Sequence, residues 1–140
     1  MRKIIFATHH QMASGLKDTF DYIAPNTAKI TVLDAYLDNN PVDKQIKDLL
    51  EDISSSDEVI IFTDLLGGSV NQAFVQYLTH PHIHLITGVN LPIILTVLLS
   101  LPKKGYLTAE AVRTAISDAR AQLIYVNDYL KTQIQDEDDE

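Results

Sequence analysis

The 140-residue sequence predicts an α/β fold, an open and mainly parallel sheet of strand order 2-1-3-4 with helices on both faces. Apolar runs of strand length alternate four times with segments whose apolar residues recur at helical spacing. The strand-length runs are apolar without polar alternation, which is typical of strands covered on both faces. Right-handed crossovers make 2-1-3-4 the default order for such a chain.

The predicted strands are short and rich in apolar and β-branched residues. The first spans Lys3–Ala7, where four consecutive apolar residues, 4 to 7, leave no polar face. The second contains the β-branched run 30–32, which favours a strand over a helix. This second strand spans Lys29–Asp34. The remaining predicted strands are Glu58–Thr63, Ile83–Thr87 and Gln122–Asn127.

The segments between the strands are predicted to be helical. Met12, Leu16, Phe20 and Ile23 recur at helical spacing after the first strand. The later helices are predicted over residues 41–53, 69–78, from 91 onward and from 109 onward. The fourth helix is apolar on most sides and is therefore expected to be buried.

Size and composition fit one domain, which we predict over residues 1–130, followed by an acidic, disordered tail over 131–140. The absence of cysteine excludes disulfides and favours a cytoplasmic location. The apolar run at the N-terminus is too short for a signal peptide, and the longest apolar stretch is far below the ~20 residues of a membrane span, so a soluble protein is expected. The chain has no basic run, which argues against nucleic acid as a partner.

The carboxyl ends of the first and third strands carry the candidate chemistry. In an open parallel sheet, ligands bind at these ends, where the strand order reverses. His9 follows the first strand and Asp64 follows the third, so the two should face each other across one strand spacing, ~5 Å. A carboxylate that accepts the N–H of an imidazole fixes its tautomer and stabilises the imidazolium. The pair therefore predicts a nucleophilic histidine, His9, oriented by Asp64.

The loop after Asp64 predicts an anion site. Gly67-Gly68-Ser69 opens a helix, and free backbone N–H groups, the helix dipole and a hydroxyl together suit a phosphate. The phosphate-binding set that we predict is Thr8, Thr63, Gly67, Gly68 and Ser69, and the surrounding partner surface is His10, Met12, Leu65 and Leu66. The same features also have structural explanations, since Asp64 can stabilise its own turn and paired glycines often only allow positive φ.

Three further histidines, His80, His82 and His84, alternate along the chain and would share one face of a strand, as metal ligands do. They lie at the start of the fourth strand, at the opposite end of the sheet from His9. We interpret them as solvated residues and predict no metal site and no cofactor.

Three ordered segments resemble the IIA component of the mannose-type bacterial sugar phosphotransferase system. Residues 4–9 resemble its opening strand and phosphorylatable histidine, 61–69 its Thr-Asp-Leu-Phe-Gly-Gly-Ser loop, and 87–92 its Gly-Val-Asn-Leu-Pro segment. The resemblance covers roughly residues 2 to 130. Two positions depart from the family pattern, because His10 stands where the family usually has Gly and Val70 where it usually has Pro.

The resemblance implies a phosphocarrier enzyme. Such proteins accept a phosphoryl group from HPr on the histidine, here His9, and pass it to a IIB component, serving the IIC and IID membrane components indirectly. The family's aspartate, matched by Asp64, hydrogen-bonds the histidine, and its Gly-Ser, matched by Gly68-Ser69, lines the phosphate site. Family members form homodimers that exchange a C-terminal strand, a part that residues 123–126 could play.

Two other classes of function are open from the residues. A nucleotide- or flavin-binding regulatory module of flavodoxin-like fold would use Gly67-Gly68-Ser69 to hold a cofactor phosphate. A metal-dependent hydrolase would use His9, His10 and Asp64 as ligands. The sequence does not indicate which sugar the phosphocarrier would serve.

Overall fold

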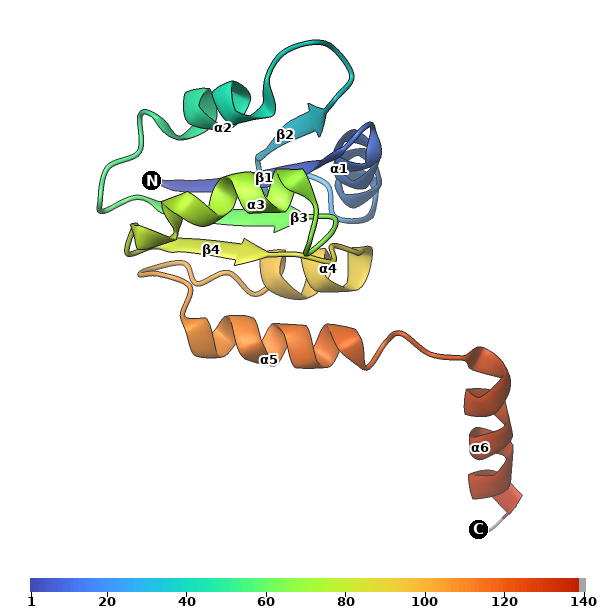
Figure 1. Cartoon of the computed structure of the whole chain (residues 1–140). Coiled ribbons are helices and arrows are strands. Elements are labelled where there is room, and N and C mark those ends of the chain that lie inside the picture. The colour runs from blue at the N-terminus through green and yellow to red at the C-terminus, as the bar shows by residue number, and fades with distance from the viewer. Residues whose placement is uncertain (139–140) are drawn as a thin grey trace.

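The computed structural model describes residues 1–138 and has one four-stranded parallel sheet in that part of the chain. Its strands are β1 (Arg2–His9), β2 (Ile30–Ala35), β3 (Glu58–Thr63) and β4 (Ile83–Ile86), in the order β2-β1-β3-β4. Figure 1 shows the strands running in the same direction. The predicted strand order is confirmed.

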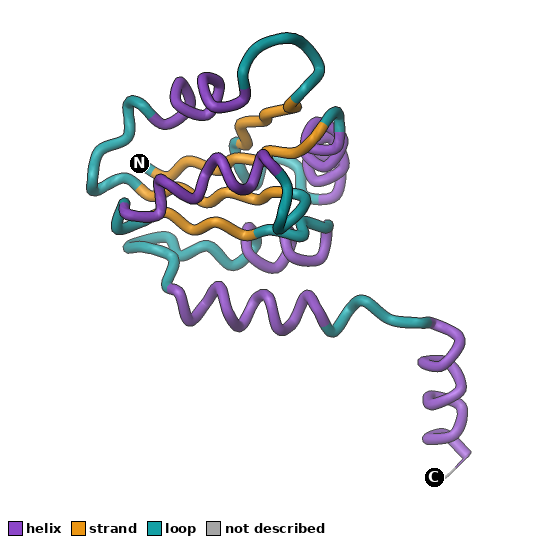
Figure 2. The backbone as a smooth tube through the Cα atoms, in the orientation of Figure 1, coloured by secondary structure: helices purple, strands orange, loops and turns teal. Residues whose placement is uncertain are grey.

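The helices cover both faces of the sheet, as predicted. Their bounds are α1 (Met12–Ile23), α2 (Val42–Leu50), α3 (Ser69–Val75), the 3₁₀ helix η1 (Gln76–Thr79), α4 (Leu91–Leu98), α5 (Ala109–Arg120) and α6 (Val126–Asp138). The ribbon and the tube place α2 and α3 on one face, and α1, α4 and α5 on the other (Figures 1 and 2).

Two apolar clusters hold these layers together. Alternate residues of β1 enter opposite clusters: Phe6 packs with α1, α4 and α5, whereas Ile5 packs with α2 and α3. Phe6 and Phe62 meet edge to face with ring centroids 5.6 Å apart. Because β1 and β3 are central and buried on both faces, their carboxyl ends are held in a fixed register, with Ala7 opposite Thr63.

The C-terminal region differs from the prediction. Gln122–Asn127 was expected as a fifth strand, but residues 123–125 form a connection and α6 begins at Val126. Figure 2 shows this region leaving the body of the domain, so its apolar, β-branched residues have no sheet edge of the chain beside them. Helix α6 extends to Asp138, within the range predicted as an acidic tail, and residues 139–140 lie outside the described residues. Within residues 1–138, every helix is too short or too polar to cross a membrane.

Candidate active site

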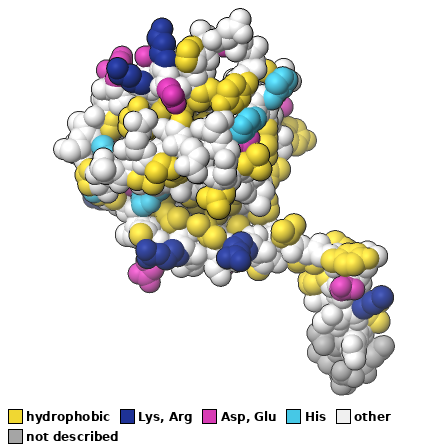
Figure 3. Space-filling view, in the orientation of Figure 1, with side chains coloured by type: hydrophobic (Ala, Val, Ile, Leu, Met, Phe, Trp, Pro, Cys, Tyr) yellow, Lys and Arg dark blue, Asp and Glu magenta, His cyan; other side chains and the backbone are white. Residues whose placement is uncertain are grey.

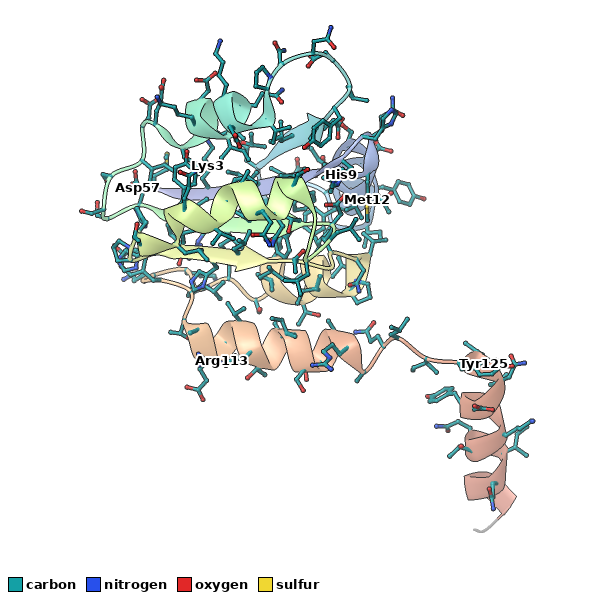
Figure 4. All side chains as sticks on the ribbon, in the orientation of Figure 1. Lys3, His9, Met12, Asp57, Arg113 and Tyr125 are labelled. Carbon is teal, nitrogen blue, oxygen red and sulfur yellow. The ribbon has the colours of Figure 1, made fainter. Side chains whose placement is uncertain are left out.

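The site lies at the carboxyl edge of the sheet, where His9 ends β1 and Asp64 follows β3. His9 and Met12 are drawn at the same end of the sheet in Figure 4, opposite Lys3 and Asp57. The Nδ1 atom of His9 lies 2.9 Å from Oδ2 of Asp64, and the backbone N–H of His9 donates to the same oxygen at 2.9 Å. The structure thus brings together the two residues that the sequence predicted to meet.

This contact fixes the tautomer of the imidazole. A carboxylate oxygen only accepts hydrogen bonds, so Nδ1 of His9 carries the proton and Nε2 keeps its lone pair. The His9 side chain is 39% exposed, whereas that of Asp64 is 10% exposed. The neutral tautomer therefore offers Nε2 as a nucleophile on a partly exposed ring, with a mostly buried carboxylate behind it.

The electrostatics of Asp64 favour its ionised form. Burial on its own would raise the pKa of this carboxyl, but hydrogen bonds from the His9 backbone N–H, the His9 ring and its own backbone lower the pKa below the ordinary value. The N–H of Leu65 donates to the other carboxylate oxygen, Oδ1, at 3.0 Å. Asp64 is thus a fixed negative charge that can stabilise a positive charge on the His9 ring.

The loop after Asp64 packs directly against the imidazole. A Cβ atom on Gly68 would lie 3.1 Å from Cε1 of His9 and 3.2 Å from Cβ of Leu65, so only glycine fits there without a shift. A Cβ atom on Gly67, by contrast, would have no neighbouring atom within 4 Å. Gly68 is the N-cap of α3 and provides no side-chain acceptor to the first N–H groups of that helix.

Asn71, which the sequence analysis did not single out, holds this loop in shape. It is buried; its Oδ1 accepts the hydroxyl of Thr63 at 2.7 Å, and its Nδ2 donates to the carbonyl of Leu66 at 3.1 Å. An asparagine three to four residues into a helix after a glycine pair carries no distinctive signal, because its role depends on the loop's path.

Tyr36 is the second residue that the sequence analysis missed. It follows β2, its ring lies 5.4 Å from the His9 ring between centroids, and its hydroxyl lies 2.5 Å from Oγ of Ser69. A signal was present, because β2 neighbours β1 in the predicted order and the residue after β2 must therefore lie near His9.

The predicted phosphate-binding residues divide into two groups. The hydroxyl of Thr8 is buried and accepts the N–H of Ala13 at 2.8 Å; that of Thr63 is buried and donates to Asn71. Both threonines support the loops from inside, and neither hydroxyl is free at the surface. Gly67, Gly68 and Ser69 form the loop beside the imidazole.

The predicted partner surface is exposed around His9. Met12, Leu65 and Leu66 are among the exposed large hydrophobic residues, and His10 is exposed as well. Figure 3 shows histidine and hydrophobic surface adjoining at this end of the domain. The backbone of His10 has a positive φ of 55°, a conformation that glycine adopts most easily.

The histidines at the opposite edge are not simply solvated, which corrects our interpretation. Nε2 of His80 contacts the carbonyl of Ser54 at 2.8 Å, and Nε2 of His84 contacts that of Leu107 at 2.8 Å. His82 stacks on Tyr106 with centroids 3.5 Å apart. The side chains that the structure describes, those of residues 1–135, contain no group of three His, Asp or Glu placed to hold a metal ion.

Comparison with known proteins identifies the family. The model of the family described as PTS system fructose IIA component, EIIA-man, matches residues 3–116. The chain belongs to this family. It is therefore a IIA component of a sugar phosphotransferase system (PTS), and the resemblance seen in the sequence is confirmed.

Solved structures of related proteins share the fold of this IIA component. A protein assigned as a phosphoenolpyruvate-dependent sugar PTS permease from Klebsiella pneumoniae is 33% identical, with a TM-score of 0.85 over 92% of this chain and 93% of that one. EIIA from Streptococcus agalactiae is 23% identical (TM-score 0.71, covering 91% and 98%), and a mannose/sorbose-specific IIA subunit from Enterococcus faecalis is 16% identical (TM-score 0.74, covering 88% and 92%). No curated protein matches the chain.

Proposed function

We propose that His9 carries a phosphoryl group on Nε2, accepts it from the phosphocarrier HPr and passes it to a IIB component during sugar uptake. The observation that carries the proposal is the 2.9 Å contact between Nδ1 of His9 and Asp64, which places the proton of a neutral imidazole on Nδ1 and its lone pair on Nε2 of a side chain that is 39% exposed. The IIC and IID membrane components would be served indirectly through IIB. A reaction with HPr belongs in the cytoplasm.

The transfer step is an in-line displacement at phosphorus. The lone pair of Nε2 attacks the phosphoryl group of the donor's phosphohistidine, an N–P bond forms to His9, and the donor's N–P bond breaks with its electron pair returning to the donor ring. The proton on Nδ1 stays, so the His9 ring gains the positive charge that the donor ring loses. Asp64 faces that charge at 2.9 Å, which supports its role as the orienting and stabilising residue.

The groups around the phosphoryl position support the same reaction. Gly68 lies beside Cε1 of the ring, with Gly67 and Ser69 as its neighbours in the loop. Met12, Leu65 and Leu66 with His10 offer an exposed surface to a partner. Phosphoryl transfer depends mainly on positioning and charge stabilisation, so few reacting groups are needed. The alternatives of a flavin module and a metal-dependent hydrolase find no support in the family match or in these contacts.

We also propose that the chain forms a homodimer through its C-terminal region. Leu123 is 90% exposed, and it is followed by a series of exposed apolar side chains: Ile124, Tyr125, Val126, Tyr129, Leu130 and Ile134. A surface of this kind is costly in water unless a partner covers it. Leu123→Asp should lower the sedimentation coefficient of the full chain from dimer to monomer, and an unchanged coefficient would contradict the proposal.

The experiment that tests the carrier role compares two neighbouring histidines. The protein is incubated with enzyme I, HPr and ³²P-labelled phosphoenolpyruvate as wild type, His9→Ala and His10→Ala. Wild type and His10→Ala should take up label, whereas His9→Ala should take up none. If His9→Ala kept the label and His10→Ala lost it, the phosphoryl group would be on His10, and the proposal would be overturned.

A further inference from the structure

Tyr36 lies beside the imidazole of His9 and has an unfavourable backbone conformation. Its φ of 67° is in the left-handed region, where a bulky side chain is uncommon. The tyrosine is also half-exposed, at 49%, so burial of its ring does not explain why this conformation is kept. Strained conformations of this kind persist where surrounding contacts hold them, and they cluster at functional sites.

The contacts of Tyr36 connect three loops of the carboxyl edge. Its own loop follows β2, its ring lies 5.4 Å from that of His9 after β1, tilted by 30°, and its hydroxyl reaches Ser69 after β3 at 2.5 Å. The imidazole thus has three neighbours: Asp64 at Nδ1, the Gly68 backbone near Cε1 and the tilted ring of Tyr36. The Cε1 atom that lies near Gly68 is bonded to the reactive nitrogen Nε2, and Ser69 directly follows Gly68 in the chain.

The chemistry of the two hydroxyls gives their hydrogen bond a direction. A phenol, with an ordinary pKa near 10, is a stronger acid than an aliphatic alcohol and is therefore the better donor. When the Tyr36 O–H donates to Oγ of Ser69, the Ser69 proton must point elsewhere. The hydroxyl of Ser69 is then a donor available to an anion beside the ring, and it is strengthened because it accepts a bond itself.

We propose that Tyr36 is a positioning residue for phosphoryl transfer, whose hydroxyl turns the Ser69 O–H towards a phosphoryl oxygen on His9. The inference rests on the proposed phosphorylation of His9. No covalent change occurs at Tyr36 or Ser69, and the Tyr36 ring holds the imidazole face in the same orientation before and after transfer. The relay supplies one hydrogen bond to a phosphoryl group in a part of the site where the loops after all four strands, residues 10–11, 36–41, 64–68 and 87–90, contain no Lys or Arg.

The test is a double-mutant cycle with Tyr36→Phe, Ser69→Ala and the combined variant. Tyr36→Phe keeps the ring over His9 and removes only the hydroxyl. The single-turnover rate of transfer from labelled HPr should fall about tenfold in each single variant, and the double variant should be no slower than the slower single one, because both remove the same relay. KM for HPr should stay within twofold, since the ring that a partner would contact remains.

A matched control separates the relay from a general effect of losing a phenol. Tyr22→Phe makes the same change on α1 at a tyrosine that is 88% exposed, and its transfer rate should equal that of wild type. All variants should unfold at the wild-type temperature, because the Tyr36–Ser69 bond is at the surface.

Three results would overturn the inference while leaving the carrier role intact: a wild-type rate for Tyr36→Phe, additive losses in the double variant, or a faster Tyr36→Phe that marks the hydroxyl as an obstacle. If wild type takes up no label, or His9→Ala keeps it, the proposed function itself fails. The two failures are therefore distinguishable in one set of assays.

Discussion

The two edges of the sheet use histidine in opposite ways. At the carboxyl edge, one nitrogen of His9 contacts a carboxylate, and the other makes no hydrogen bond to the described residues on a side chain that is 39% exposed. At the amino edge, His80 engages both nitrogens, Nε2 with the Ser54 carbonyl and Nδ1 with the N–H of His82 at 3.0 Å, and Nε2 of His84 contacts a carbonyl. A histidine whose nitrogens are occupied connects loops, whereas one with a charged partner and a free nitrogen can react.

The charged groups follow the same division. Glu58 at the amino edge is 3% exposed, pairs with Nε of Arg2 at 2.5 Å and accepts the N–H of Leu107 at 2.6 Å. It thereby joins β1, β3 and the segment before α5. Asp64 at the carboxyl edge instead directs its oxygens to a single reactive residue and the start of its own loop. The comparison indicates that the amino edge stabilises the domain and the carboxyl edge carries its chemistry.

Replacing Asp64 should have the largest effect on activity. Asp64→Asn removes the charge and can present an N–H to Nδ1, which favours the wrong tautomer of His9. Transfer from HPr should fall by about 10²- to 10³-fold, measured as the single-turnover rate of label uptake. His80→Gln at the other edge should leave the rate unchanged, and a loss of less than threefold in Asp64→Asn would break the division between the edges.

The same aspartate predicts a pH dependence of stability. Its pKa is lowered in the folded protein by the hydrogen bonds from His9, so the unfolded state binds a proton more readily. The contribution of Asp64 is therefore present above its unfolded pKa, near 3.9, and is lost as the pH falls through the lower folded value. The difference in melting temperature between wild type and Asp64→Asn should shrink below about pH 4, and a difference that grows on acidification would contradict this sign.

Replacing Glu58 should have a large effect on stability and none on chemistry. Glu58→Gln leaves the charge of Arg2 without its carboxylate partner; because the Arg2 side chain is 27% exposed, the loss is that of a charged hydrogen bond, about 2 kcal/mol. Urea denaturation should show this loss in the free energy of unfolding, while the folded variant transfers phosphate at the wild-type rate. The control is Glu51→Gln at an exposed position, which should change stability little. A transfer defect in folded Glu58→Gln would show that the edges are coupled.

Gly68→Ala should have a moderate effect confined to the site. The backbone of Gly68, with φ of −74° and ψ of 152°, suits alanine, so the effect comes from the close contacts of the new Cβ, 3.1 Å from Cε1 of His9 and 3.2 Å from Cβ of Leu65. The displaced ring should transfer about tenfold more slowly. Gly67→Ala, which meets nothing within 4 Å, is the matched control and should keep the wild-type rate. Equal rates for both variants would contradict close packing on the ring.

The strands and the His9–Asp64 pair could be predicted because both follow from rules of parallel sheets. Apolar runs without alternation identify buried strands, and neighbouring buried strands bring their carboxyl ends together whatever the loop details. The pair then depends only on strand order, which the structure confirms.

Other features of the site could not be predicted, because they depend on the path of the backbone in the loops, which the spacing of apolar residues does not indicate. Tyr36 reaches Ser69 from a backbone with positive φ. The threonines predicted to bind phosphate instead turn inward, where their hydroxyls bond to Ala13 and Asn71. The fifth strand failed for a different reason: residues 122–127 have strand composition, but a strand also needs an edge to pair with, and in the described chain this region runs away from the sheet.

His10→Gly should have the smallest effect, and it sharpens the distinction between the reactive histidine and its neighbour. His10 has φ of 55°, so glycine should relieve the left-handed strain and, after its own entropy cost, raise the free energy of unfolding by about 0.5–1 kcal/mol. Asn26→Gly, at φ of 58°, is the control and should gain less, because asparagine tolerates this region. If His10→Gly lowered the stability, the His10 side chain would have to make contacts worth more than the strain, and the carboxyl edge would then also be part of what holds the domain together.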